Sequence, residues 1–224
     1  MGPSMEECRA ECVAMVLCPD WSILKIFGFG NGEEVLQPKL SHCRPQELTG
    51  HQDINGEAGD ILYACYLSMA RAGVAALQFW DKNSSKWGQA HMQARHAILK
   101  VFLSAGPEFC SLDYSKPDLS DLTVKIDRSK IISHGRPAVE KFLQKIQVYK
   151  ATADFKAGKE LYEGITAVDD FFANKVRPAV LAAAQPRKVF VQANTILEGD
   201  KVTLREYPAT PEGMIQSYAD REYI

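Results

Sequence analysis

The stretches AGDILYACYLSMARAGVAALQFW (58–80) and KWGQAHMQARHAILKVFLS (86–104) decide the fold of this chain. Both carry apolar residues at helical spacing, and the polar sequence DKNSS (81–85) lies between them. The pattern predicts two long core helices joined by a loop. Around them the sequence predicts a strand over 122–126 and further helices over 4–18, 21–27, 137–149, 154–163 and 168–184, the last with a break at Pro178.

Residues 187–224 differ in character from the rest. Valine and leucine alternate with polar residues at 189–191 and 202–204, on either side of Glu198-Gly199-Asp200, and this predicts a β-hairpin. A last helix is predicted to start at Thr210-Pro211. A lone hairpin is marginal in water, so this tail is expected to join a sheet elsewhere. We therefore expect a mainly α (α+β) fold, with a helical part over 1–186 and a hairpin tail over 187–224.

Residues 29–57 interrupt the helical pattern. Glycine and proline recur there among polar residues. A segment of this length without periodicity is uncommon inside a compact domain, so the sequence predicts a long loop or an insertion.

The charge balance argues against two classes of partner. Lys plus Arg number 26 against 28 Asp plus Glu, for a net charge of −2. The basic excess typical of a general nucleic-acid binder or a polybasic membrane binder is missing, so we expect neither partner. No uninterrupted apolar run reaches about 18 residues, which predicts no membrane span. Glu6 and Glu7 occupy the place of a signal peptide's basic region, and the six cysteines form no CxxC pairs, so we expect a reduced cytoplasmic protein.

The first predicted helix carries EECRAE (6–11). Ser4 and Glu7 fit a capping box. Glu7 and Glu11 lie one turn apart on one face, where like charges repel by about 0.2–0.5 kcal/mol. A cation or a histidine between the two carboxylates would remove the repulsion. Alternatively, they are a capping residue and part of a solvated face, and the spacing leaves both interpretations open.

The second polar pattern, QAHMQAR (89–95), opens the second core helix. His91 falls on an apolar stripe with Ile98 and Phe102, and Arg95 lies one turn beyond His91. A histidine and an arginine on a core-facing helix need polar partners, because unpaired buried polar groups are costly. They are either a core histidine with a structural ion pair, or two donors that face a cleft and stabilise an oxyanion.

Other motifs are sparse. Arg187-Lys188 opens the tail and can bind a carboxylate or be an ordinary surface pair. The chain contains no Walker loop, dinucleotide fingerprint, GxSxG elbow or HExxH sequence.

Several of these strings occur together, in the same order, in a known family. The chain resembles the dipeptidyl peptidase III family of zinc-dependent dipeptidyl aminopeptidases. The matching stretches are EECRAE (6–11), KIFGF (25–29), MARAGVAALQFW (69–80), WGQAHMQARHAIL (87–99), IDRSKI (126–131), LYEG (161–164) and VQANTILEG (191–199).

The resemblance implies a role for each matching residue. Glu7 would be a zinc ligand, and Glu11 would orient a zinc-ligating histidine through a hydrogen bond. His91 would stabilise the tetrahedral intermediate at the scissile peptide bond. Weaker correspondences imply substrate-binding roles for Gln89, Arg95, Arg187 and Lys188.

The family also implies parts that this sequence does not hold. Its other zinc ligands and its general base come from an HExxGH motif upstream of EECRAE, and its second lobe contains a β-barrel. We therefore expect residues 1–186 to be part of the helical zinc lobe and 187–224 to return into the second lobe. The chain is expected to be a fragment, inactive alone, whose partners are short peptide substrates and the missing amino-terminal part of the same protein. A non-catalytic helical module that binds peptides is the alternative.

Overall fold

The computed structural model describes residues 2–18, 20–29, 56–184 and 190–221. The chain divides into two compact units, Met1–Ala183 and Ala184–Ile224, and each is described by itself. The predicted fold class is confirmed, because the described residues are mainly helical with short two-stranded antiparallel sheets. The assignment of the two units to two lobes of a larger protein stays a prediction.

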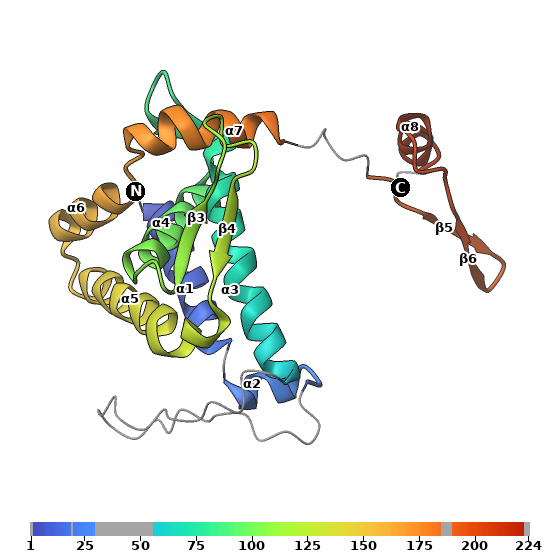
Figure 1. Ribbon diagram of the computed structural model, residues 1–224. Coiled ribbons are helices and arrows are strands. Elements are labelled where there is room, and N and C mark those ends of the chain that lie inside the picture. The colour runs from blue at the N-terminus through green and yellow to red at the C-terminus, as the bar shows by residue number, and fades with distance from the viewer. Residues whose placement is uncertain (1, 19, 30–55, 185–189, 222–224) are drawn as a thin grey trace. The chain divides into compact units, whose positions relative to one another are not determined.

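Helices dominate the first unit (Figure 1). In chain order its elements are α1 (Gly2–Leu17), α2 (Trp21–Ile26), α3 (Glu57–Ala75), η2 (Ala76–Phe79), β1 (Trp80–Asp81), β2 (Lys86–Trp87), α4 (Ala90–Ser104), β3 (Cys110–Asp113), β4 (Thr123–Ile126), η3 (Arg128–Lys130), η4 (Ile131–Gly135), α5 (Arg136–Ala151), α6 (Phe155–Thr166), η5 (Phe172–Val176) and α7 (Arg177–Ala182).

The prediction of one helix over 58–80 followed by a loop is wrong at its end. The helix stops at Ala75, a 3-10 turn follows, and β1 and β2 form a short hairpin that pairs Trp80 with Trp87. The Asp81 carboxylate accepts hydrogen bonds from the Asn83 amide and the Ser84 hydroxyl, which closes the turn. Local side-chain bonds of this kind compete with helix continuation.

Two further expectations need correction. The predicted strand at 122–126 is present as β4, but the sequence reasoning missed β3, whose Cys110 pairs with Ile126. The predicted helix over 168–184 is present over 170–182, but its middle is the wide π-turn η5, and α7 follows directly. Pro178 lies in the first turn of α7, where its missing N–H costs little, and the irregular turn precedes it. The predicted loop over 29–57 falls almost wholly outside the described residues.

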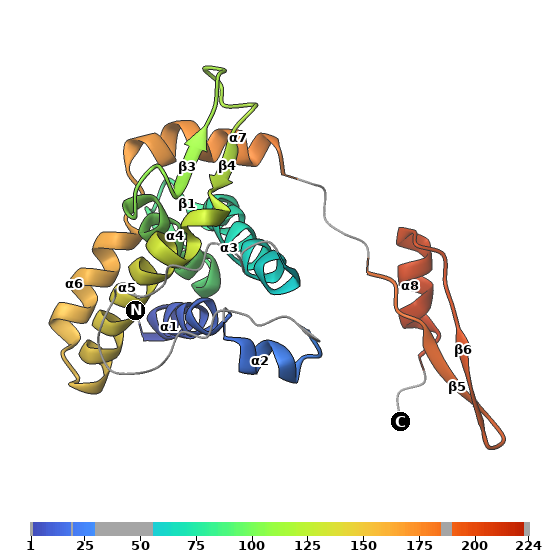
Figure 2. The ribbon, with the colours of Figure 1, turned by 60° about the horizontal axis from the view of Figure 1, so that its bottom comes forward.

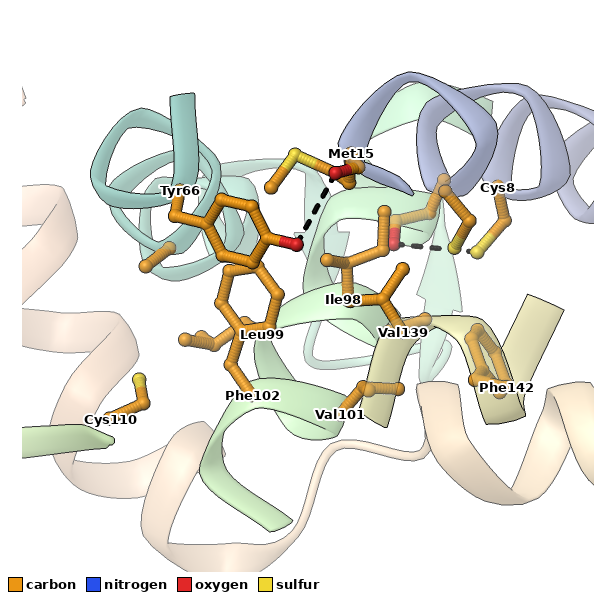
Figure 3. Packing of buried hydrophobic residues seen from close by; sticks show 14 of the residues in the cluster. Cys8, Met15, Tyr66, Ile98, Leu99, Val101, Phe102, Cys110, Val139 and Phe142 are labelled. Atoms are coloured by element: carbon orange, nitrogen blue, oxygen red, sulfur yellow. Dashed lines mark hydrogen bonds between the residues drawn. The ribbon is translucent and has the colours of Figure 1, made fainter. Parts of the chain in front are cut away.

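The core of the first unit lies where α4 packs between α1 and α3 (Figure 2). Tyr66 of α3 stacks on Phe102 of α4 with ring centroids 5.3 Å apart, and its hydroxyl donates to the Met15 carbonyl of α1 at 3.3 Å (Figure 3). Gly73 allows α3 and α4 to cross closely, since an added Cβ would lie 2.5 Å from the Leu99 Cβ. The same contacts fix the position of α1 beside α4.

The stretch that contains α3 is also apolar enough to resemble a membrane-spanning helix. By length and composition alone, Gly59–Phe79 could cross a membrane, with 33% of that stretch buried inside the protein. Leu62, Tyr66, Ala70 and Leu77 of this stretch are part of the core. The expected absence of a membrane span stays a prediction.

The second unit consists of a hairpin and a helix. Strands β5 (Asn194–Glu198) and β6 (Lys201–Arg205) pair, and α8 (Pro211–Ala219) begins after Thr210, whose hydroxyl accepts from the Gly213 amide. The predicted hairpin is confirmed, but its first strand starts at Asn194, since residues 190–193 form no strand and Val189 lies outside the described residues. Gly199 has a φ of +63°, which suits the first position of a two-residue hairpin turn.

Candidate functional site

Helix α1 presents different side chains to different neighbours. Cys8, Cys12 and Met15 are buried in the core. Glu7 and Glu11 lie on a face that is turned toward the first turns of α4. The predicted capping box is wrong, because the helix begins at Gly2 and the Ser4 hydroxyl bonds to other parts of the chain.

His91 lies between the two carboxylates. Its Nδ1 is 3.5 Å from the Glu7 Oε2 and 3.3 Å from the Glu11 Oε1. The like-charged pair on α1 thus has a histidine as its neighbour, which was one of the two interpretations of the spacing. His91 lies 80 residues after Glu11 in the chain, so the packing of α4 against α1 brings them together.

Arg95 completes the group. Its Nε donates to both Glu11 oxygens, at 3.1 and 3.3 Å. The Glu11 side chain is only 15% exposed, so the arginine compensates the charge of a largely buried carboxylate. Among the described residues no lysine or arginine pairs with Glu7, whose side chain is 39% exposed. With a protonated imidazole the four groups together carry no net charge.

Of the two interpretations of His91, the one that makes it a core histidine is wrong. Its side chain is 45% exposed, because it lies in the first turn of α4, beside the acidic face of α1. His96 is the core histidine of this helix. It packs against Trp87 and Phe172 and its Nδ1 lies 3.3 Å from the Gly73 carbonyl oxygen. The two histidines face different neighbours, as their five-residue spacing predicts.

Glu6 belongs to a different contact. Its carboxylate forms ion pairs with Arg9 and with Lys150 of α5. Hydrogen bonds, first from Arg9 and then from Lys150, lower the pKa of Glu6 to about 2. This glutamate ties α1 to α5, away from the His91 group.

The other residues predicted to bind substrate are Gln89, Arg187 and Lys188. Gln89 is the residue before α4, and its Oε1 accepts a hydrogen bond of 2.7 Å from the Met92 amide. Gln89 therefore caps α4, and its substrate-binding role stays a prediction. Arg187 and Lys188 lie outside the described residues.

The described residues do not by themselves fit a zinc ion. No group of three or more His, Cys, Asp or Glu side chains among them is arranged to hold a metal. Zinc sites need at least three protein ligands. Glu11 is engaged by Arg95, which leaves Glu7 as the exposed carboxylate of the pair. Whatever metal chemistry the family uses, the part of the chain seen here supplies at most part of the ligand set.

Sequence reasoning missed the buried polar contacts behind this group. Tyr162 of α6 hydrogen-bonds to Ser4 of α1, and Thr166 of α6 hydrogen-bonds to Trp87 of β2 and Gln93 of α4. A tyrosine with apolar neighbours at helical spacing signals a buried hydroxyl that needs a partner. The partner of Tyr162 could not be found that way, since Ser4 lies 158 residues earlier.

Comparisons with known proteins agree with the family resemblance that the sequence motifs indicate. The chain matches the family described as Peptidase family M49 over residues 1–222. It is 40% identical to dipeptidyl peptidase 3 of Nematostella vectensis and of Mus musculus, and 42% identical to that of Dictyostelium discoideum. These alignments cover 99% of this chain but 27–28% of the relatives, so the chain spans about a quarter of their length. The chain belongs to peptidase family M49.

Proposed function

We propose that this chain forms one wall of the active site of a zinc-dependent dipeptidyl peptidase, which removes dipeptides from the amino terminus of short peptides. One observation carries the proposal: α1 and α4 bring Glu7, Glu11, His91 and Arg95 into one group at the surface of the first unit. Membership of peptidase family M49 supports the hydrolytic class of the reaction. The names of the relatives support dipeptides as the product.

His91 is the residue proposed to act on the reacting peptide bond. Its exposure and its position between acidic groups support a role in holding negative charge that develops on the carbonyl oxygen. When Nδ1–H is held by a carboxylate, donation from Nε2 requires the imidazolium form. Glu11 and Arg95 orient the imidazole, because their ion pair fixes the carboxylate that Nδ1 faces.

Glu7 is proposed as this chain's contribution to the zinc site. It is the carboxylate of the pair that no arginine engages, and it is accessible. Other ligands and a general base would come from an HExxGH helix in the rest of the protein. Alone, this chain is therefore proposed to be inactive. The rest of the same protein and short peptides are its proposed partners, and the cytoplasm is its proposed location.

Zinc content and dipeptide release test the proposal together. Both are measured on the full-length protein that contains this chain, after exhaustive dialysis, with a dipeptidyl-naphthylamide as substrate. Glu7→Gln is expected to abolish release and to lose the zinc ion. Glu6→Gln is the matched control on the same helix and is expected to keep both, because Glu6 pairs with Arg9 and Lys150.

Three results would contradict the proposal. They are an inactive full-length parent, an equally active Glu7→Gln variant, and loss of zinc from both variants alike. Calorimetric binding of short peptides by the metal-free parent, without hydrolysis, would favour the non-catalytic module instead.

A further inference from the structure

A buried hydroxyl network joins the starts of α1, α4 and α6. The Tyr162 hydroxyl of α6 donates to the Ser4 carbonyl at 2.9 Å and lies 2.7 Å from the Ser4 Oγ. The Ser4 hydroxyl donates to the Ala90 carbonyl at 3.2 Å. Both side chains are almost inaccessible to solvent. One consistent assignment of protons lets Ser4 donate to α4 while Tyr162 donates to Ser4.

Thr166 extends the network by one turn of α6. Its carbonyl accepts from the Trp87 Nε1 at 3.1 Å, and its hydroxyl accepts from the Gln93 Nε2 at the same distance. The Thr166 hydroxyl in turn donates to the Tyr162 carbonyl. Helix α6 therefore holds the first turns of both α1 and α4 by directional bonds, in addition to apolar packing.

The network and the His91 group involve neighbouring residues of α1 and α4. Ser4 precedes Glu7 by three residues on α1, about one helical turn, and Ala90 is the residue before His91 on α4. A bond between Ser4 and Ala90 thus sets how the acidic face of α1 stands against the first turn of α4. Packing alone is less specific about such a register, because apolar contacts are not directional.

We infer that Tyr162 is a positioning residue: through Ser4 and Ala90 it holds Glu7 and Glu11 at the distance from His91 that the reaction needs. The inference rests on the proposed function for its catalytic consequence. The hydroxyl is suited to the task, since burial raises the pKa of Tyr162 and keeps it a neutral donor. A small displacement of a reacting group is enough to matter, because a shift of about 1 Å can cost 10²-fold in rate.

Removing the hydroxyl alone tests this inference. Tyr162→Phe keeps the ring and its packing but breaks the bond to Ser4. Tyr149→Phe is the matched control on the neighbouring α5, since the Tyr149 hydroxyl has no hydrogen bond among the described residues. In the full-length protein, at a temperature where every variant is folded, kcat of Tyr162→Phe is expected to fall about tenfold with KM within about twofold. The control is expected to keep both values.

A second readout on the 224-residue chain separates this inference from the proposed function. The His91 ring signals, assigned by their loss in His91→Gln, are followed by ¹H–¹⁵N NMR at constant pH. They are expected to move in Tyr162→Phe and to stay in place in Tyr149→Phe. If the full-length parent lacks peptidase activity, the proposed function fails, and the NMR result still decides whether Tyr162 positions His91.

Two results would overturn the inference. One is a Tyr162→Phe protein that melts earlier but keeps both its kcat and its His91 signals, which would make the tyrosine merely structural. If Tyr162→Phe does not fold, Ser4→Ala removes the hydroxyl that links Tyr162 to the Ala90 carbonyl, while the bond from Tyr162 to the Ser4 carbonyl stays. An unchanged kcat and unchanged His91 signals in Ser4→Ala would overturn the inference equally.

Discussion

The two units of this chain are stabilised by different kinds of contact. In the first unit, aromatic and aliphatic side chains from α1, α3, α4 and α5 share one core, and residues such as Phe102 are fully buried. Among the described residues of the second unit only Gly213 and Ser217 are buried. Leu197 there is 71% exposed, and Val202 and Leu204 are similarly open.

Polar contacts hold the second unit instead. The Asn194 side chain donates to the Ser217 carbonyl and to the Tyr207 hydroxyl, and Arg205 pairs with Asp220. A two-stranded hairpin with an exposed apolar face is marginal in water. The comparison teaches that burial stabilises the first unit, whereas the described residues of the second leave their apolar side chains open. That the hairpin joins a sheet elsewhere stays a prediction.

The sharpest test of this comparison is a pair of large-to-small substitutions. Phe102→Ala removes a ring that stacks on Tyr66 and meets Phe109 edge-on, so it is expected to lower the free energy of unfolding by about 3–5 kcal/mol. Leu197→Ala is expected to change it by less than about 0.5 kcal/mol. Far-ultraviolet circular dichroism during urea unfolding measures both effects, because each unit contains helix and strand. Equal effects of the two substitutions would contradict the comparison.

The buried histidine gives the first unit a pH dependence, and residues 184–224 contain no histidine. Burial lowers the pKa of His96 from 6.5 to about 4. Between these values the unfolded state binds more protons than the folded state, so stability is complete above pH 6.5 and declines as the pH falls toward 4. The shift corresponds to about 3 kcal/mol in free energy of unfolding.

Urea unfolding at pH 4.5 and 7 measures this dependence. His96→Phe is expected to reduce the difference between the two pH values, while His134→Gln, which changes a more exposed histidine, is expected to leave it as in the parent. A parent whose stability is the same at both pH values would show that His96 is not buried as described.

A smaller effect is expected where α3 and α4 cross. Gly73→Ala places a Cβ 2.5 Å from the Leu99 Cβ and 2.6 Å from the Arg95 carbonyl oxygen, so it is expected to cost about 1–3 kcal/mol. Gly164→Ala on α6 is the control, because its Cβ meets nothing within 4 Å. In a helix that change is expected to be neutral or stabilising by about 1 kcal/mol. Denaturation midpoints measure both, and a Gly73→Ala protein as stable as Gly164→Ala would argue against the close crossing.

The sequence predicted elements better than it predicted their ends. Periodicity located α3 and α4, since long apolar helices carry a strong signal. It placed the end of α3 too late. The Trp80–Trp87 strand pair and the Asp81 turn compete with continuation of the helix, and hydrophobic periodicity does not detect such contacts. The strand β3 was missed for a similar reason, because a strand of four residues forms only through its hydrogen bonds to a partner strand, here β4.

The candidate site shows the same limit. Spacing alone brought Glu7 and Glu11 together, and it left open whether a histidine lay between them. Their approach to His91 depends on how α1 packs on α4, which no local pattern encodes. Ser4 was misread because a capping box explained it locally, while its actual partners are Ala90 and Tyr162. The roles of these residues in catalysis remain predictions from family resemblance.

The most direct test of the account is the activity of His91 variants in the full-length protein. Loss of one donor to a developing oxyanion typically costs about 10²–10³ in kcat. His91→Ala is expected to lower kcat for dipeptidyl-naphthylamide hydrolysis by that amount, with an unchanged melting temperature, because the side chain is half exposed and outside the core. His134→Ala, outside the His91 group, is expected to keep the parent's kcat. A His91→Ala protein with the parent's kcat would contradict the claim that the face shared by α1 and α4 is part of a peptidase active site.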